Sequence, residues 1–318
     1  MAKIGVHNRL TAEHAGEKSG IYPLIAAKVR RESAAAFDDD VLWPAQWWGL
    51  DRSRVFMKAA PEVQEAALAA CARGLLNEAY FIEKSGLAYS AKMVLLAPST
   101  DVAQLYALIG ADEARHLAWI EPFVSADDKT RPRGPFLAFL SSLIEACKPE
   151  LLVYLVQVIL EGWGIDHYRR LADGCSHPGL AAIFRNILKD EAMHHRSGIL
   201  QHDAKILRGK NRAAVAVALE TYADMVRVGP QSALAAVDAV CGGLAEEELA
   251  DVMTALGHET ETPRKLALLK ELMLQPGTEA VVEKIDFTPL SVPEAVAFYQ
   301  GHSAANGPAD SLSSAPNP

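Results

Sequence analysis

Apolar residues recur every three to four positions over most of the 318-residue chain, and no long stretch alternates apolar and polar residues. The first spacing is that of one face of an α-helix, and alternation is that of a half-buried strand. Glycine and proline fall mostly between the periodic stretches, where helices have to end. The pattern therefore predicts an all-α fold.

The helix boundaries are predicted from where this period begins and breaks. Pro61 can open a long helix over 61–97, because proline is tolerated in the first helical turn. Pro98 and the run Ser99-Thr100-Asp101 then give a break and N-cap candidates for a second helix over 101–124. We expect these elements to follow: a short helix over 136–147, a third long helix over 150–173, a loop over 174–179 and a fourth long helix ending near 207.

These boundaries predict a four-helix bundle with an N-terminal extension and extra C-terminal helices. The four regions are the extension 1–60, the bundle 61–209, the C-terminal helical region 210–300 and the tail 301–318. The extension is expected to be irregular apart from a helical stretch over 25–36. The C-terminal region is expected to hold three or four amphipathic helices. The tail is rich in Ala, Ser, Pro, Asn and Gly, a composition typical of disorder.

Composition and charge narrow the classes of protein. Half of the residues are hydrophobic, 22% are charged and the net charge is −9, which argues against a nucleic-acid partner. The apolar run Leu151–Leu160 is half the length of a membrane span, and the first residues lack the apolar run of a signal peptide. The four cysteines form no CxxC pair, which favours a reducing compartment. We therefore expect a soluble cytoplasmic protein without a membrane partner.

Two related pentapeptides carry the candidate chemistry. Asp112–His116 reads DEARH and Asp190–His194 reads DEAMH, and both lie inside predicted helices. A single Glu-x-x-His is weak evidence, because such a pair is expected by chance in a chain of this length. The two units are 78 residues apart, and their shared context raises the signal.

The same 78-residue shift relates the two preceding helices. Glu83 and Gly86 are followed, 78 residues later, by Glu161 and Gly164. Each half therefore has a glutamate, a glycine three residues on and a Glu-x-x-His unit that begins thirty residues after the first glutamate. This arrangement indicates a duplicated helical hairpin.

The geometry of a hairpin gives an independent check on the first glutamate of each half. Residues of two antiparallel helices lie at the same height when they are equally far from the connecting loop. Glu83 and its Glu-x-x-His partner are centred near position 98, and Glu161 and its partner near position 177, both in predicted loops. Glu78 would lie about 7 Å out of level, at a rise of 1.5 Å per residue. Glu83 is therefore the better candidate.

The spacing has a chemical reason. Residues i and i+3 share a helix face, so a carboxylate and an imidazole project together into the bundle. Four carboxylates in an apolar core repel each other unless they are protonated or met by cations. Two divalent metals would supply those cations, and carboxylate and imidazole ligands suit iron or manganese. Asp112 and Asp190 each precede a histidine by four residues and can accept a hydrogen bond from an imidazole N–H.

Residues 61–209 resemble the ferritin-like di-iron carboxylate superfamily, in which two helices each give a Glu and two others each give Glu-x-x-His. The unit DEARH is similar to the D-E-x-R-H signature of that superfamily, whereas the second unit has Met193 in place of the arginine. The resemblance implies a ferritin-like four-helix bundle that binds two metal ions. One ion would be held by Glu83, Glu113 and His116 and the other by Glu161, Glu191 and His194, with Glu113, Glu191 or both as bridging ligands.

The resemblance also implies an activity. We expect a non-heme di-iron oxygenase or oxidase that uses O₂ on a small organic substrate, by hydroxylation, N-oxygenation or oxidative cleavage, with Glu113 and Glu191 as the catalytic carboxylates. Two Fe ions are expected as cofactors, with a Mn/Fe pair as the alternative. An external electron donor is implied, because the sequence has no Gly-rich nucleotide fingerprint and no Cys-rich cluster motif. A homodimer would fit the superfamily.

Two other functions remain open at this stage. One is a radical-storing small subunit of a ribonucleotide-reductase-like system, although Ile120 stands where such subunits usually have tyrosine. The other is a non-catalytic helical scaffold. Within the oxygenase interpretation, the chain also departs from the arylamine N-oxygenases of the superfamily. Those enzymes carry a third histidine where this chain has Ile187.

Several other residues have two interpretations each. Gly86 and Gly164 leave space for O₂ or substrate, or they allow close helix packing. Tyr80 and Tyr168 line the site or are redox-active, or they are core aromatic residues, which is the more common case. The cluster Trp43/Trp47/Trp48 serves electron transfer or covers one end of the bundle, and we favour the second interpretation.

Overall fold

The computed structural model describes residues 10, 20–29, 41–207 and 211–310. Every regular element in these residues is a helix, which confirms the all-α prediction. The N-terminal region contains α1 (Tyr22–Val29), α2 (Ala45–Trp48), the 3-10 helix η2 (Leu50–Arg52) and α3 (Arg54–Lys58). The predicted helix over 25–36 is thus described only as far as Val29. Its remainder lies outside the described residues.

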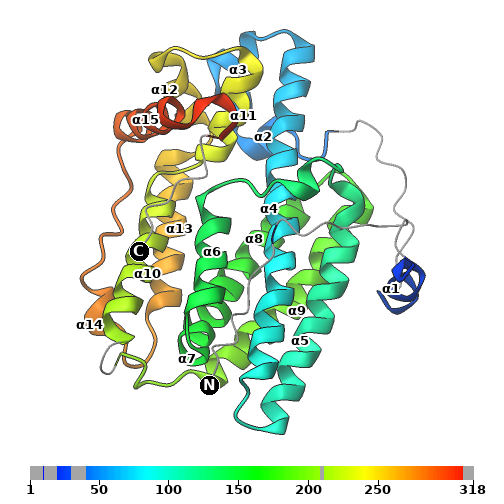
Figure 1. Cartoon of the computed structure of the whole chain (residues 1–318). Helices are drawn as coiled ribbons and strands as arrows, with labels where there is room; N and C mark the ends of the chain where they lie inside the picture. The colour runs from blue at the N-terminus through cyan, green and yellow to red at the C-terminus, as the bar shows by residue number, and fades with distance from the viewer. Residues whose placement is uncertain (1–9, 11–19, 30–40, 208–210, 311–318) are drawn as a thin grey trace.

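The central region follows the predicted order of long helices. Its elements are α4 (Pro61–Leu95), α5 (Thr100–Ile120), the 3-10 helices η3 (Glu121–Phe123) and η4 (Asp128–Thr130), α6 (Pro135–Ala146), α7 (Pro149–Leu152), the π-helix η5 (Val153–Leu160), α8 (Glu161–Gly174) and α9 (Pro178–Gln201). Figure 1 shows α4 and α5 side by side, with α8 and α9 beside them. The pairs α4–α5 and α8–α9 pack along their lengths, and α5 also contacts α9.

Local side-chain bonds fix where these helices begin. The Ser99 hydroxyl accepts a hydrogen bond from the Val102 N–H at the start of α5. Nδ1 of His177 accepts one from the Leu180 N–H at the start of α9, and Pro178 occupies the first turn. These bonds satisfy N–H groups that have no partner within the helix.

The third long helix departs from the regular α-helix that its sequence predicts. Residues 153–160 form the π-helix η5, which ends at the residue before Glu161. The hydrogen bonds of a π-helix join residues five apart instead of four, and π-helical segments are rare and frequently lie at functional sites. The directions in which side chains project from η5 therefore differ from those that a 3.6-residue period predicts.

Two helix ends also differ from prediction. Helix α9 ends at Gln201, six residues early, because His202 leaves the helix with an extended ψ and its Nε2 contacts the Pro276 carbonyl oxygen at 3.1 Å. Helix α15 (Val292–Asp310) continues through residues 301–310, where disorder was expected. Alanines at 304 and 305 favour helix there, whereas the Gly, Pro and Asn content of the segment indicated disorder.

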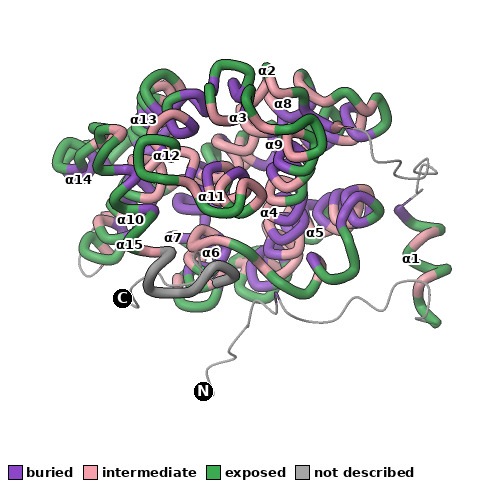
Figure 2. Tube along the Cα trace, turned by 90° about the horizontal axis from the view of Figure 1, so that it is seen from above, coloured by how far each residue is buried: buried purple, intermediate pink, exposed green. Residues whose placement is uncertain are grey.

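The remaining C-terminal helices pack on the central region. They are α10 (Asn211–Arg227), α11 (Gln231–Cys241), α12 (Glu246–Ala255), α13 (His258–Met273) and α14 (Glu279–Val282). Helices α10 and α13 contact η5, and α11 lies along α4. Figure 2 shows that buried positions face inward from both sets of helices. Across the described residues, the search for a helix long and apolar enough to cross a bilayer finds none.

Candidate metal centre

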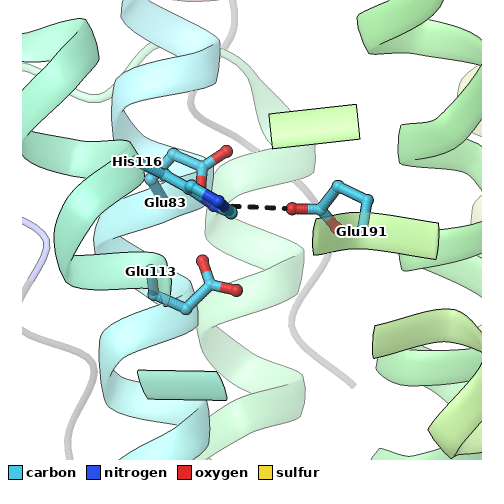
Figure 3. A group of neighbouring side chains, drawn as sticks. All are labelled: Glu83, Glu113, His116 and Glu191. Carbon is cyan, nitrogen blue, oxygen red and sulfur yellow. Dashed lines mark hydrogen bonds and ion pairs between the residues drawn. The ribbon is translucent and has the colours of Figure 1, made fainter. Parts of the chain in front are cut away.

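Six side chains meet between the four central helices in two overlapping groups. The first group is Glu83, Glu113, His116 and Glu191, shown in Figure 3, and the second is Glu113, Glu161, Glu191 and His194. Within each group, one ligand atom from every residue lies within 4.8 Å of the others. Glu113 and Glu191 belong to both groups. The structure thus brings together all six residues that the sequence predicts as ligands, whereas Glu78 belongs to neither group.

The hairpin geometry explains this convergence. Glu83 projects from the middle of α4, and Glu113 and His116 project from one face of α5. The second hairpin repeats this arrangement: its first glutamate lies at the start of α8 and its Glu-x-x-His unit lies on α9. Because α4 lies along α5 and α8 along α9, each first glutamate lies level with its partner unit.

His116 contacts carboxylates through both ring nitrogens. Its Nδ1 lies 3.0 Å from Oε2 of Glu83 and 3.7 Å from Oε1 of Glu191, the contact drawn in Figure 3. Its Nε2 lies 3.1 Å from Oδ2 of Asp190, an aspartate of the second hairpin. A carboxylate at Nε2 favours the tautomer that carries its proton there, so the Nδ1 lone pair is directed at the glutamates.

His194 repeats this arrangement in the opposite direction. Its Nδ1 lies 3.4 Å from Oε1 of Glu113 and 3.7 Å from Oε2 of Glu161. Its Nε2 lies 3.3 Å from Oδ2 of Asp112, an aspartate of the first hairpin. Both aspartates therefore contact an imidazole, as the sequence suggests, but each contacts the histidine of the other hairpin. The spacing along one helix could not reveal this exchange.

The four glutamates of the site carry more negative charge than the surrounding side chains can balance. Burial, followed by the charges of neighbouring carboxylates, raises the pKa of Glu113 and of Glu191 well above the ordinary value. Burial would also raise the pKa of Glu161, but its interactions with Glu191 and with the imidazole of His194 outweigh that effect and lower the pKa. Burial would lower the pKa of His194, yet the hydrogen bond with Asp112 and the nearby carboxylate of Glu161 raise it to about 10. Without other cations, the cluster must hold protons to offset its negative charge.

The donor set fits divalent metal ions. Nδ1 of His194 is buried and has no hydrogen-bond partner among the described residues, although three carboxylates lie around it. A buried nitrogen in this position is satisfied when it coordinates a cation. Each group offers one imidazole nitrogen and three carboxylates, a set that suits iron or manganese. Whether ions bind there remains a prediction.

Tyr168 is an aromatic residue that contacts a candidate ligand directly. Its hydroxyl donates a hydrogen bond to Oε1 of Glu83, and its ring stacks on Phe184 at 5.8 Å between centroids. Tyr80, the other tyrosine that the sequence indicates, is buried in the apolar core, and its hydroxyl has no hydrogen-bond partner within the part of the chain that the structure describes. The sequence could place both near the ligand faces but could not distinguish them.

Gln157, in the π-helix, connects that segment to α9. Its side-chain oxygen accepts hydrogen bonds from Tyr89 and Tyr106, and its Nε2 donates to the His194 carbonyl oxygen at 3.0 Å. Tyr89 and Tyr106 lie on α4 and α5. One buried amide thus links three of the four helices around the site, next to a candidate ligand.

The two glycines of the repeat lie against the carboxylates that both groups share. A Cβ atom at Gly86 would overlap the carboxylate of Glu113, whereas a Cβ at Gly164 would lie 3.7 Å from Oε2 of Glu191, an ordinary contact. Gly86 is therefore required by the close approach of Glu113. Gly164 leaves open space beside Glu191.

The tryptophan cluster lies at one end of the bundle. The Trp43 indole N–H donates to the Leu171 carbonyl oxygen at 3.0 Å, and its ring packs 6.1 Å from that of Phe184. The Trp47 indole N–H donates to the Arg170 carbonyl oxygen at 3.3 Å. The cluster thus covers the C-terminal end of α8, in agreement with the interpretation that we favour.

A cavity of about 790 Å³ extends from the ligands toward the C-terminal helices. The four glutamates of the two groups line it, together with Gly86 and Gly164. Apolar side chains of α4, α6 and α8 form much of its wall, including Ile82, Leu140 and Trp163. The site therefore opens onto a space large enough for a small organic molecule.

Comparisons with models of known protein families, with curated proteins and with solved structures find no match.

Proposed function

We propose that the chain is a ferritin-like di-iron carboxylate protein, an oxygenase or oxidase that uses O₂ on a small organic substrate. One observation carries this proposal: two ligand groups share Glu113 and Glu191, and each group adds a histidine whose other nitrogen contacts an aspartate. Two glutamates and two Glu-x-x-His units on four helices are the ligand set of that superfamily. A purely structural cluster of four buried carboxylates would be costly.

The chain's own residues would hold the two ions at a fixed separation. Glu83, Glu113, His116 and Glu191 would hold one ion and Glu113, Glu161, Glu191 and His194 the other. When bound, the ions supply the redox chemistry, in which reduction of O₂ is coupled to oxidation of the substrate. Tyr168 can move a proton to or from Oε1 of Glu83, because its hydroxyl is hydrogen-bonded there. The apolar wall of the cavity would keep bulk water from the reacting groups.

The remaining parts of this proposal concern partners and compartment. The four cysteines are free and none belongs to either ligand group, and the sequence has no Gly-rich nucleotide fingerprint, so the proposed activity includes a separate electron donor. Free thiols are consistent with a reducing cytoplasm. We retain iron as the expected metal, Mn/Fe as the alternative and a homodimer as the expected assembly.

Metal loading tests the proposal directly. Wild type, Glu113→Ala and Glu65→Ala, a variant of an exposed residue of α4, are loaded anaerobically with Fe(II), desalted and measured by mass spectrometry. We expect about two ions per chain in wild type and Glu65→Ala and a clear loss in Glu113→Ala. Circular dichroism establishes that all three proteins are folded. A folded wild type that binds neither Fe(II) nor Mn(II) would overturn the proposal.

Reaction with O₂ separates an enzyme from a structural metal site. The reduced, loaded protein is mixed with O₂, and O₂ consumption is followed with an electrode beside the Glu113→Ala variant. We expect consumption in wild type only. If the wild type binds two ions but consumes no O₂, the metals have a structural role and the scaffold interpretation takes precedence.

The hydrogen bond between Tyr168 and Glu83 favours a second candidate, the radical-storing small subunit. A tyrosine bonded to a metal ligand could lose an electron to the oxidised centre and a proton to the carboxylate. Electron paramagnetic resonance after oxygenation would then show a persistent tyrosyl signal that Tyr168→Phe abolishes. Absence of the signal in wild type would eliminate this candidate.

A further inference from the structure

The cavity is elongated along the central helices. Its lining residues on α4 run from Cys71 to Tyr89, which corresponds to roughly 27 Å at 1.5 Å per residue. The candidate ligand Glu83 lies within this span. The cavity therefore continues well past the carboxylates, and a molecule longer than O₂ can occupy it.

One part of the wall carries ionisable side chains without partners. Glu78 of α4, His167 of α8 and Lys265 of α13 all line the cavity, and we call these three residues the polar end. Nε2 of His167 is buried and finds no hydrogen-bond partner in the described ranges of the chain. Among the described residues, Glu78 and Lys265 form no hydrogen bond or ion pair, although their charges interact across the cavity. Buried polar groups of this kind are normally satisfied, so their partner is expected to be a ligand.

The charged neighbours of the polar end are already satisfied by one another. Arg170 pairs with Glu261, and Arg264 contacts Glu261 at 3.1 Å and Asp166 at 3.0 Å. Lys265 is therefore the cation at this end that is left to bind an incoming group. A ligand amine would be repelled by Lys265, whereas an anion would be attracted.

The protonation preferences of the polar end agree with an anionic ligand. Burial raises the pKa of Glu78 and lowers that of His167 to about 4, so both groups tend to be neutral and each can donate a hydrogen bond. Burial lowers the pKa of Lys265 as well. One bound carboxylate would restore the charge on Lys265 and balance it.

The position of the polar end fixes which part of a ligand reaches the metal groups. Glu78 lies five residues before Glu83 on α4, about 7.5 Å along the helix axis, and His167 lies six residues after Glu161 on α8, about 9 Å. Ile82 lines the wall one turn from Glu78, toward the ligands. A head group held at the polar end would thus be separated from the ligands by one to two helical turns.

We propose that the polar end binds the carboxylate of an amphipathic substrate whose apolar body extends past Ile82 to the carboxylates beside Gly86 and Gly164. This proposal rests on the proposed function only in calling the bound molecule a substrate, because the binding site itself needs no metal. It predicts that the metal groups face a carbon several bonds from the carboxylate.

Calorimetric titration with three eight-carbon probes tests this assignment: octanoate, 1-octanol and octylamine. Each is titrated into metal-free and anaerobically Fe(II)-loaded full-length protein. We expect octanoate to bind more tightly than the alcohol or the amine in both forms. Equal affinity for octanoate and octanol would overturn the proposal, because it would show that the apolar body alone is recognised.

Variants locate the bound carboxylate. Lys265→Met removes the charge but keeps the length of the side chain, and it should weaken octanoate binding roughly 10- to 100-fold, as expected for a lost charge-assisted hydrogen bond. Lys270→Met, an exposed lysine of the same helix, is the matched control and should bind as wild type does. Glu78→Gln, which stays neutral, should retain binding. Unchanged octanoate affinity in a folded Lys265→Met protein would refute the assignment.

Metal content in the same samples separates this proposal from the previous one. Lys265→Met should bind as much iron as wild type, because Lys265 belongs to neither ligand group. Octanoate binding that requires iron and ignores Lys265→Met would mean that the carboxylate binds the ions, which overturns the polar end. A wild type that binds octanoate through Lys265 but binds no metal would instead overturn the di-metal function alone.

Discussion

The hairpins α4–α5 and α8–α9 supply the same ligand types at the same spacing, yet their surroundings differ. In the first, Glu83 lies within a continuous α-helix, is 1% exposed and is held by Tyr168 and His116. In the second, Glu161 follows the π-helix η5, and its side chain is 11% exposed. The first glutamate is thus fixed on several sides, while its counterpart lies at a break in helix geometry.

The aspartates of the two hairpins also differ: the one in the first hairpin has more partners and is less exposed than the one in the second. Asp112 pairs with Arg115 of its own helix as well as with His194. Asp190 has no such arginine, because position 193 is methionine, and its side chain is 31% exposed against 12% for Asp112. The shared ligand spacing therefore coexists with a closed first half and a more open second half.

The strongest test of this comparison contrasts shared and single-group ligands. Glu113→Ala or Glu191→Ala should remove metal from both groups, whereas Glu83→Ala or Glu161→Ala should leave about one ion per chain, because each affects a single group. Mass spectrometry of anaerobically loaded, desalted protein gives the values. Equal losses in all four variants would show that the two groups act as one site.

The exchange of aspartates between hairpins predicts a crossed effect. Asp190→Asn should weaken metal binding at the His116 group about 10- to 100-fold, as expected for loss of the partner that orients a ligand histidine. Asp190→Asn should then add little to His116→Ala but its full effect to His194→Ala, which competitive chelator titration can measure. The opposite pattern would place Asp190 with the histidine of its own helix.

Substitution of the two repeat glycines tests the difference between the closed first hairpin and the more open second hairpin. Gly86→Ala forces the Glu113 carboxylate to move and should cost about 1–3 kcal/mol of unfolding free energy or an equivalent loss of metal affinity. Gly164→Ala meets only an ordinary contact, so it should keep the metal and gain about 1 kcal/mol from helix propensity. Urea unfolding and metal content distinguish the two. Equal destabilisation by both substitutions would contradict the difference between the halves.

The smallest effect concerns the missing arginine. Met193→Arg would place a guanidinium beside Asp190, as Arg115 lies beside Asp112 in the first half. Residue 193 is 40% exposed, so the new pair should change the free energy of unfolding by at most about 1 kcal/mol in urea titrations. A larger gain would show that the open half is limited by this one ion pair.

The helices and the convergence of the six candidate ligands could be predicted because both depend on local spacing. The Glu-x-x-His units need only the period of a helix, and the level of Glu83 needs only the length of its hairpin. The exchange of Asp112 and Asp190 could not be predicted, because it depends on how the two hairpins pack. The π-helix also escaped prediction, since Val153–Leu160 is apolar at every position but one and shows no period to read.

The polar end was missed for a related reason. Neither Lys265 nor Glu78 has a distinctive spacing in the sequence, and the height of Glu78 in its hairpin only excludes it as a partner of the Glu-x-x-His unit. The signal available in the sequence was a lysine four residues before Leu269. The structure shows that Leu269 is buried, on the side of α13 that faces the protein. A charged residue in that position could be recognised only once α4, α8 and α13 were placed around one cavity. Contacts between distant segments, rather than local patterns, decide what such residues do.

If the two groups bind metal as proposed, the crossed aspartate–histidine contacts would make metal binding and the docking of the two hairpins reciprocal events. Each ligand group takes residues from both hairpins, so neither group is complete while the hairpins are apart. Ions that bind only the docked arrangement stabilise it by mass action, and a chain with docked hairpins binds ions more tightly than one whose hairpins have separated. Chelation should therefore lower the melting temperature of the whole four-helix unit, and heating should release both ions in a single cooperative transition.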